Sequence, residues 1–449
     1  MRHSPTLRAP FFVIALALLA GCGNERIASS SSPESAQATG GGDEIEIWPL
    51  PAQPGAAQPD LAVAPDGRLL LSWINAQQGR RPALQFAEFY ADGHWEGPRT
   101  IVVGNALFVN WADTPHIIAT ADRGLWVHWL QKSADAPYAY DVMLARSLDH
   151  GMNWSAPVRV HDDGTQTEHG FVSMWPQSHN TLGMAWLDGR NTPAAGAEHG
   201  GGEHGGGHDK RVDHMGAGAD PEHSGGMMTV RAAVFDPHLR PLSATQVDAS
   251  SCDCCQTDVA TTSEGALLVY RDRREGEIRD IYASRFDGKT WSEPRAVHAD
   301  DWKMPACPVN GPSVAAEGAH AYVGWYTAAG DVPTVMLARS TDAGTHFEKP
   351  RVVDRGEAVH GRVAVAVQTT QVWVVWLREE HGAQSLWLAR YSPDLSRELQ
   401  RIELAKLQGK GRATGFPKLA LRQGALHAVW TDVIDGRPQL FGARVGSQR

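Results

Sequence analysis

The sequence predicts an all-β protein, a β-propeller built from four-stranded blades. Three observations lead to this fold class. A short β unit recurs along the chain, the copies are evenly spaced, and each copy carries an aromatic residue near the end of its second strand. The repeat count gives seven blades, with a ring of six as the alternative.

The first strands of the units supply the spacing. Asp60 and His116 occupy matching places 56 positions apart (116 − 60), and most later steps are close to this length. The one long step, from Phe171 to Asp258, contains an insertion at residues 194–228. The seven starts lie near Asp60, His116, Phe171, Asp258, Ser313, Arg362 and Lys418.

The second strands supply the aromatic signature. They end at Trp73, Trp129, Trp186, Tyr270, Trp325, Trp376 and Trp430. Short alternating strands with one aromatic residue per unit are typical of propeller blades.

The two ends of the repeat array indicate how the ring closes. The seventh unit stops after Val445, one strand short, while residues 44–48 (EIEIW) precede the first unit and read as a strand. Pairing between these segments would remove the open sheet edges at the seam. We therefore expect an N-terminal strand to close the propeller.

A turn motif follows the third strand of several units. Residues 147–154 read SLDHGMNW and residues 340–347 read STDAGTHF, with shorter versions at 92–95 and 287–291. In such a turn the aspartate accepts N–H groups, the glycine supplies a positive φ and the aromatic ring packs into the blade. The chain resembles the Asp-box proteins of the sialidase-like superfamily in these turns, which we expect to be structural.

The resemblance also implies which loops share a face. Connections between blades, and loops between second and third strands, open on one face, and the Asp boxes lie on the other. The strand starts listed above then surround the central mouth on the first face. The chain departs from sialidases in two respects, because they have six blades and an Arg-Ile-Pro signature that is absent here.

The N-terminus has the features of a targeting segment. Residues 1–21 have a short basic start and a brief apolar run, and residues 19–22 (LAGC) resemble a bacterial lipobox. The resemblance implies lipidation of Cys22 and an outer-membrane lipoprotein of the cell envelope, on the periplasmic or the surface side. Residues 22–42 are rich in Ser, Ala and Gly and read as a flexible tether, and residues 43–449 form the propeller.

The formal net charge of −10 argues against nucleic acid, because phosphate binding needs a concentrated basic face. The partners left open are the membrane, through the lipid anchor, and a metal ion, a glycan or an envelope protein.

Four cysteines fall in two loops that we expect to be neighbours. Cys252, Cys254 and Cys255 lie in the connection entering the fourth blade, and Cys307, with Met304, lies in the connection entering the fifth. Two disulfides are one interpretation, and a bond from Cys252 or Cys254 to Cys307 is geometrically easier than one between adjacent residues. The other interpretation is a metal site with thiolate ligands.

The insertion at residues 194–228 has a composition suited to metal binding. Its glycine-rich sequence spaces potential ligands that combine imidazole and thioether groups: His199, His204, His208, His214, Met215, His223, Met227 and Met228. Thioethers select soft Cu(I), and the tract resembles the His/Met segments of periplasmic copper-resistance proteins. A solvated loop without a ligand is the alternative.

Three functions follow from these patterns. The first is a non-enzymatic binding protein for a soft metal, copper or another transition metal, held by the four cysteines with Met304. The second is an exo-α-sialidase-type glycoside hydrolase. Its residues would be a carboxylate-binding triad, an acid and a tyrosine nucleophile: Arg190, Arg271 and Arg362, Asp60 or Asp258, and Tyr326. The third is a protein-interaction scaffold.

Overall fold

The computed structural model describes residues 45–77, 79–193, 226–368 and 370–446. The predicted signal peptide, the lipidation site and the tether lie outside the described residues. So do six of the predicted ligands in the insertion: His199, His204, His208, His214, Met215 and His223.

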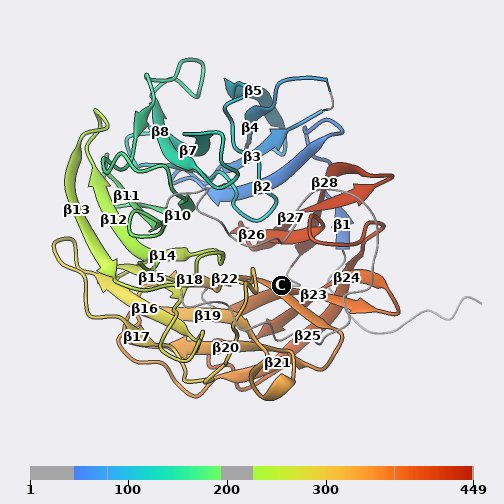
Figure 1. The fold of residues 1–449 in the computed structure, drawn as a ribbon. Helices are drawn as coiled ribbons and strands as arrows, with labels where there is room; N and C mark the ends of the chain where they lie inside the picture. The colour runs from blue at the N-terminus through green and yellow to red at the C-terminus, as the bar shows by residue number, and fades with distance from the viewer. Residues whose placement is uncertain (1–44, 78, 194–225, 369, 447–449) are drawn as a thin grey trace, which may run out of the picture. The chain divides into compact units, whose positions relative to one another are not determined.

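The described residues form seven four-stranded antiparallel sheets, which confirms the all-β propeller and decides for seven blades over six. In Figure 1 the blades follow one another around a ring in chain order. The innermost strand of each blade contacts the innermost strands of its neighbours, so β2 touches both β6 and β26.

The first three blades precede the long insertion or contain it. Blade one consists of β2 (Ala56–Val63), β3 (Leu69–Asn75), β4 (Ala83–Phe89) and β5 (Trp95–Val103). Blade two consists of β6 (Ile117–Ala119), β7 (Leu125–Lys132), β8 (Tyr140–Ser147) and β9 (Val158–Arg159). Blade three consists of β10 (His169–Pro176), β11 (Leu182–Asp188), β12 (Thr229–Phe235) and β13 (Pro241–Asp248).

The remaining blades follow without a long insertion. Blade four consists of β14 (Asp258–Thr262), β15 (Gly265–Arg271), β16 (Ile281–Phe286) and β17 (Arg295–Ala296). Blade five consists of β18 (Ser313–Glu317), β19 (His320–Thr327), β20 (Thr334–Ser340) and β21 (Arg351–Arg355), with the short 3-10 helix η1 (Ala329–Asp331). Blade six consists of β22 (Val359–Gln368), β23 (Gln371–Glu380), β24 (Ala383–Tyr391) and β25 (Glu398–Lys406). Blade seven consists of β26 (Gly415–Arg422), β27 (Ala425–Ile434), β28 (Arg437–Gly446) and β1 (Ile45–Ile47).

The hydrophobic core lies between neighbouring blades. Second strands such as β3 and β11 are covered on both faces, which is why they are nearly continuous apolar runs. The rim strand β13 is exposed at its first six residues. Trp186 of blade three shares one buried cluster with Val142 and Leu144 of blade two. The aromatic residue in each repeat therefore fills the space between adjacent sheets.

The predicted closure is confirmed. β1 pairs antiparallel with β28, placing Ile45 opposite Val445. The next residue, Trp48, donates its backbone N–H to the carbonyl of Gly442 at 2.9 Å, and its ring is 4 % exposed. The N-terminal strand thus supplies the fourth strand of the last blade (Figure 1).

Strand register confirms the two faces. In blade three Asp188, at the end of β11, is paired with His169 at the start of β10 and with Thr229 at the start of β12. The start of β12 is also where β13 ends, since Val230 is paired with Asp248. The end of the third strand lies at the opposite end of the sheet, and in blade two the third strand, β8, ends at Ser147, the first residue of the Asp box. Blade connections and second-to-third loops therefore share one face.

The Asp boxes are turn devices, as expected. In the full motif Ser147 Oγ accepts the N–H of Gly151 at 2.9 Å, and Asp149 accepts the N–H of Asn153 at 2.9 Å. Gly151 has φ +73°, and a Cβ there would lie 2.2 Å from the ring of Phe86 in the neighbouring blade. Only glycine suits this position, because it adopts the positive φ and leaves room for the ring.

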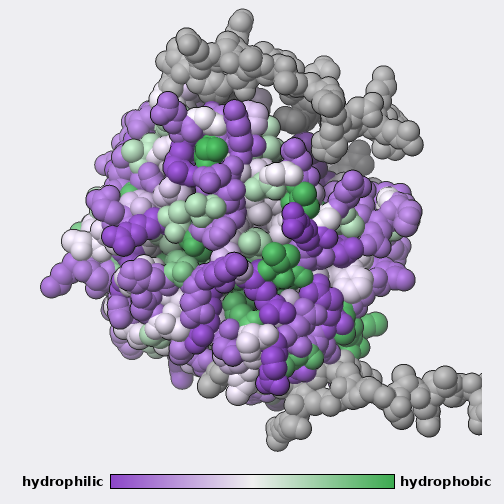
Figure 2. Space-filling model, turned by 90° about the horizontal axis from the view of Figure 1, so that it is seen from below, coloured by the Kyte–Doolittle hydropathy of each residue, from purple (hydrophilic) through white to green (hydrophobic). Residues whose placement is uncertain are grey.

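The surface seen in Figure 2 is mostly hydrophilic, with small separate hydrophobic areas. Apolar side chains are thus concentrated between the blades. Within the described ranges, no helix has the length and hydropathy needed to cross a bilayer.

Candidate functional site

The four cysteines outside the N-terminal segment meet on one face. The loop between β13 and β14 carries Cys252, Cys254 and Cys255, and the loop between β17 and β18 carries Cys307. Cys254 and Cys307 form a disulfide, whereas Cys252 and Cys255 are free thiols that are 0 % and 1 % exposed. The structure thus has one disulfide instead of the two that one interpretation required, and a pair of free thiols beside it.

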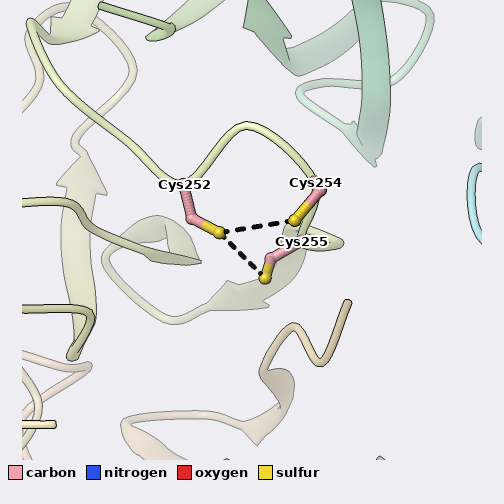
Figure 3. A group of neighbouring side chains, drawn as sticks. All are labelled: Cys252, Cys254 and Cys255. Carbon is pink, nitrogen blue, oxygen red and sulfur yellow. Dashed lines mark hydrogen bonds between the residues drawn. The ribbon is translucent and has the colours of Figure 1, made fainter. Parts of the chain in front are cut away.

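The sulfur atoms converge on Cys252. Its Sγ lies 3.1 Å from that of Cys255 and 3.8 Å from that of Cys254 (Figure 3). Cys252 and Cys255 also have the Cys-x-x-Cys spacing found in metal-binding and redox dithiols. The three sulfurs form one group, which we call the sulfur cluster.

An arginine that the sequence analysis did not single out neutralises this group. Arg279, in the loop between β15 and β16, places Nη1 3.2 Å from Cys252 Sγ and is held by Glu277 at 2.7 Å. Burial opposes ionisation of Cys252, but the hydrogen bond with Cys255 and the charge of Arg279 outweigh it and lower the pKa of the Cys252 thiol to about 7. Burial raises the pKa of the Cys255 thiol well above its usual value. Near neutral pH the pair is therefore suited to hold one thiolate and one thiol.

The last residue of the insertion, Met228, lies beside the sulfur cluster. Ser251, just before Cys252, donates its backbone N–H to the carbonyl of Met228 at 2.9 Å. The Met228 side chain is 4 % exposed and belongs to the core between blades three and four. Met227 is partly exposed, and Met304 is partly exposed with its backbone N–H bound to the carbonyl of Glu277 at 2.9 Å.

A second polar group lies on the same face and was missed from the sequence. His161 Nδ1 is 2.8 Å from Asp163, and the His161 ring stacks on His169 with centroids 3.7 Å apart and planes 6° apart. These two histidines and Asp141 could offer ligand atoms to one ion. However, the lone pair of an imidazole nitrogen lies in its ring plane, so two rings stacked in parallel do not both point at one ion. In this arrangement the group is a packing and ion-pair cluster.

The three arginines of the hydrolase hypothesis are not gathered in one pocket. Arg190 pairs with Asp188 at 2.7 and 2.8 Å. Arg271 is 1 % exposed and donates to backbone carbonyls, among them Tyr326 at 2.7 Å and Arg279 at 2.6 Å. Arg362 lies against the ring of Phe416 at 4.4 Å. Of the three, Arg362 alone lines the central cavity.

The central cavity has a volume of about 270 Å³ and is surrounded by residues on or next to the innermost strands, including those predicted to line the central mouth. They include Asp60, His116, Asp258, Ser313, Arg362 and Lys418. The two aspartates link neighbouring blades. Asp60 accepts the N–H of Ile117 at 3.0 Å, and Asp258 accepts the N–H of Val314 at 2.8 Å. Burial raises the pKa of Asp60, but the opposing charge of His116 and hydrogen bonding lower it overall, to about 2, so this carboxylate is not poised as an acid at neutral pH.

The tyrosine proposed as a nucleophile has a packing environment. The Tyr326 ring contacts Trp302 at 5.7 Å, and burial raises its pKa. A tyrosine–glutamate pair exists elsewhere, where the hydroxyl of Tyr140 donates to Glu168 at 2.5 Å. Tyr140 is fully buried, so its hydroxyl is not open to a substrate.

The carboxyls around Tyr140 should make stability fall as the pH rises. Burial raises the pKa of Glu168 to about 8 and that of Asp113 to about 7. The folded state holds these protons more tightly than the unfolded state, so their contribution to stability is complete below about pH 4. It decreases by about 1.4 kcal/mol per pH unit for each group and is lost once the pH has risen through 7 for Asp113 and 8 for Glu168. We expect a higher melting temperature at pH 5.5 than at pH 8.5, measured by scanning calorimetry.

Glu168→Gln should flatten that pH dependence, because it removes one of the two groups. Glu264→Gln is the control, since this carboxylate is exposed, and should leave the slope unchanged. Equal slopes in wild type and Glu168→Gln would contradict the assignment.

Comparison with known proteins gives likenesses of fold only. No protein-family model matches the sequence, and no curated protein matches it. Among solved structures, a protein of unknown function from Dyadobacter fermentans is similar at 12 % identity and TM-score 0.48, covering 91 % of this chain and 99 % of that chain. The phage phi92 endosialidase has 9 % identity and TM-score 0.49, with 91 % and 70 % covered. An α-L-arabinanase from Penicillium chrysogenum has 10 % identity and TM-score 0.45, with 90 % and 98 % covered. No activity is inferred from these likenesses.

Proposed function

We propose that this chain is a non-enzymatic binding protein of the cell envelope that handles a soft transition metal, copper in the first place. Cys252 and Cys255 are the ligands in this proposal. The observation that carries it is the buried thiol pair itself, with two sulfurs 3.1 Å apart beside the guanidinium of Arg279.

Thiolate chemistry supports a soft metal. Soft sulfur ligands select Cu(I) over hard cations, and the metal replaces the thiol protons when it binds. With metal–sulfur bonds of about 2.3 Å the two sulfurs would move apart by about 1 Å on binding, a change within reach of side-chain rotation. Arg279 offsets the negative charge of the resulting bis-thiolate.

The surroundings of the pair support delivery of an ion to it. Met228, the last residue of the histidine- and methionine-rich insertion, accepts a hydrogen bond on its carbonyl from the residue before Cys252. In this proposal the imidazole and thioether groups of residues 194–228 capture ions, which then pass to the thiols. The resemblance of residues 19–22 to a lipobox supports an envelope location with a lipid on Cys22.

Cu(I) titration of the full chain tests the proposal. The protein is reduced, freed of metal and titrated without oxygen against a chromogenic Cu(I) chelator. We expect Cys252→Ser/Cys255→Ser to lose one tightly bound copper per chain, because it lacks both thiolates. Cys254→Ser/Cys307→Ser is the matched control, since it also loses two cysteines but keeps the proposed ligands, and it should retain that copper.

The two variants must first show the same folded circular dichroism spectrum as the wild type. If the variant without Cys252 and Cys255 then binds as much Cu(I) with the same affinity as the wild type, the thiol pair is not the site.

A further inference from the structure

Cysteines in two oxidation states touch one another in the sulfur cluster. Cys252 and Cys255 are buried thiols, whereas Cys254 is bonded to the exposed Cys307. Figure 3 shows the Sγ of Cys252 directed at both Cys254 and Cys255. Metal binding would use only the two thiols. It gives no role to the Cys254–Cys307 disulfide, although the Sγ of Cys254 lies 3.8 Å from the Sγ of Cys252.

We propose that the four cysteines form an internal thiol–disulfide exchange relay. The relay moves one disulfide between the surface pair, Cys254 and Cys307, and the buried pair, Cys252 and Cys255. This activity goes beyond metal binding and does not depend on it.

In the first step the thiolate of Cys252 attacks Cys254 Sγ. A Cys252–Cys254 bond forms, the Cys254–Cys307 bond breaks, and Cys307 departs with the electron pair as a thiolate. The attacking and attacked sulfurs are already in van der Waals contact at 3.8 Å. Arg279, 3.2 Å from Cys252 Sγ, stabilises the nucleophilic form, and Cys307 is exposed, so water solvates the leaving group.

In the second step Cys255 attacks Cys252 Sγ, 3.1 Å away, and its proton passes to the departing sulfur of Cys254, which lies within 4.8 Å. A Cys252–Cys255 bond forms, the Cys252–Cys254 bond breaks, and Cys254 departs as a thiol. One disulfide and two thiols are present before and after the two steps, so the exchange needs no oxidant or reductant. The spacing of Cys252 and Cys255 is the Cys-x-x-Cys spacing of redox-active dithiols.

The surface pair is the part of the relay that another molecule can reach. After the exchange, Cys254 and Cys307 are a dithiol on the face that carries the blade connections, with Cys307 exposed and Cys254 partly exposed. A dithiol there can reduce a disulfide of a second molecule to two thiols while its own disulfide re-forms. The substrate class is therefore a disulfide, of a protein or a small molecule, that can approach the exposed Cys307.

Trapping with an alkylating reagent tests the relay. The metal-free full chain, in its Cys254–Cys307 form and with a chelator present, is incubated folded with iodoacetamide, and the labels and disulfides are located by peptide mass spectrometry. We expect labels to accumulate on Cys254 and Cys307 while the disulfide moves to Cys252 and Cys255. In Cys255→Ser the relay should stop halfway, with a label on Cys307 and a Cys252–Cys254 bond.

Two further variants make the result decisive. Cys252→Ser lacks the first nucleophile, so labelling of Cys307 should be at least tenfold slower, and Arg279→Gln should slow it to a lesser degree. The relay is overturned if the wild type is labelled on Cys252 and Cys255 with the Cys254–Cys307 bond intact, or if Cys252→Ser is labelled on Cys307 at the wild-type rate. Cys254→Ser/Cys307→Ser cannot run the relay but keeps the proposed copper ligands, so failure of one proposal leaves the other standing.

Discussion

Trp48→Ala should destabilise the protein by about 3–5 kcal/mol, as expected for the loss of a buried tryptophan. The ring is 4 % exposed and contacts Phe89 and Trp95 of blade one and His427 of blade seven. It therefore lies at the seam where the first and last blades meet. Removing it leaves a cavity at the point where the N-terminal strand closes the ring.

The measurement is urea unfolding followed by tryptophan fluorescence and circular dichroism. Ile47→Ala is the matched control, because Ile47 is the preceding residue but is 88 % exposed, and it should change the free energy of unfolding by less than about 0.5 kcal/mol. Equal effects of the two substitutions would show that Trp48 does not contribute to closure.

Arg271→Met should also be strongly destabilising, by about 3 kcal/mol or more, because it leaves several buried carbonyls without their donor. The Arg271 guanidinium donates to the carbonyls of Asn310, Arg279 and Tyr326 and stacks on Trp302 at 4.8 Å. These acceptors belong to the loop entering blade five, to the β15–β16 loop and to β19. The residue thus ties blade four to blade five.

Arg240→Met is the control for this prediction. Its side chain is 74 % exposed and pairs with Asp236, so the change should cost less than about 0.5 kcal/mol. If Arg271→Met unfolds at the same urea concentration as the wild type, the guanidinium is not structural, and a ligand-binding role for it would return to consideration.

The fold could be predicted because its determinants are repeated. One irregular unit would carry little information, but seven aromatic positions at matching places indicate a ring of like blades. Closure followed from the same logic, since the seventh unit lacked a strand that residues 44–48 could provide. The seam contacts of Trp48 could not be read from the sequence, because they join residues more than 370 positions apart.

The site was predicted in part. Repeat spacing placed Cys252 and Cys307 in neighbouring connections, and the disulfide from Cys254 to Cys307 agrees with that placement. Which cysteine pairs depends on distances of a few ångströms, which spacing does not supply. The role of Arg279 could not be predicted, because it belongs to no motif and lies in a charged loop with three other arginines nearby.

The aspartates and arginines of the hydrolase hypothesis show a different limit of prediction from the sequence. Asp60 lies within β2 and Asp258 starts β14, both innermost strands as predicted, but their oxygens accept N–H groups of the next blade. A carboxylate at a propeller mouth can bind a ligand, or it can accept hydrogen bonds from the neighbouring strand. The sequence shows an aspartate in both cases, so it does not distinguish the two roles. Arg271 likewise occupies the expected loop end, but its donors are taken by carbonyls.

X-ray absorption at the copper edge of the Cu(I)-loaded full chain tests the central claim most directly, because it identifies the atoms bound to the metal. The account predicts sulfur neighbours at thiolate distances, lost in Cys252→Ser/Cys255→Ser and kept in Cys254→Ser/Cys307→Ser. A spectrum dominated by nitrogen neighbours and unchanged when Cys252 and Cys255 are replaced would place the ion on imidazoles and contradict the assignment of the thiol pair as the binding site.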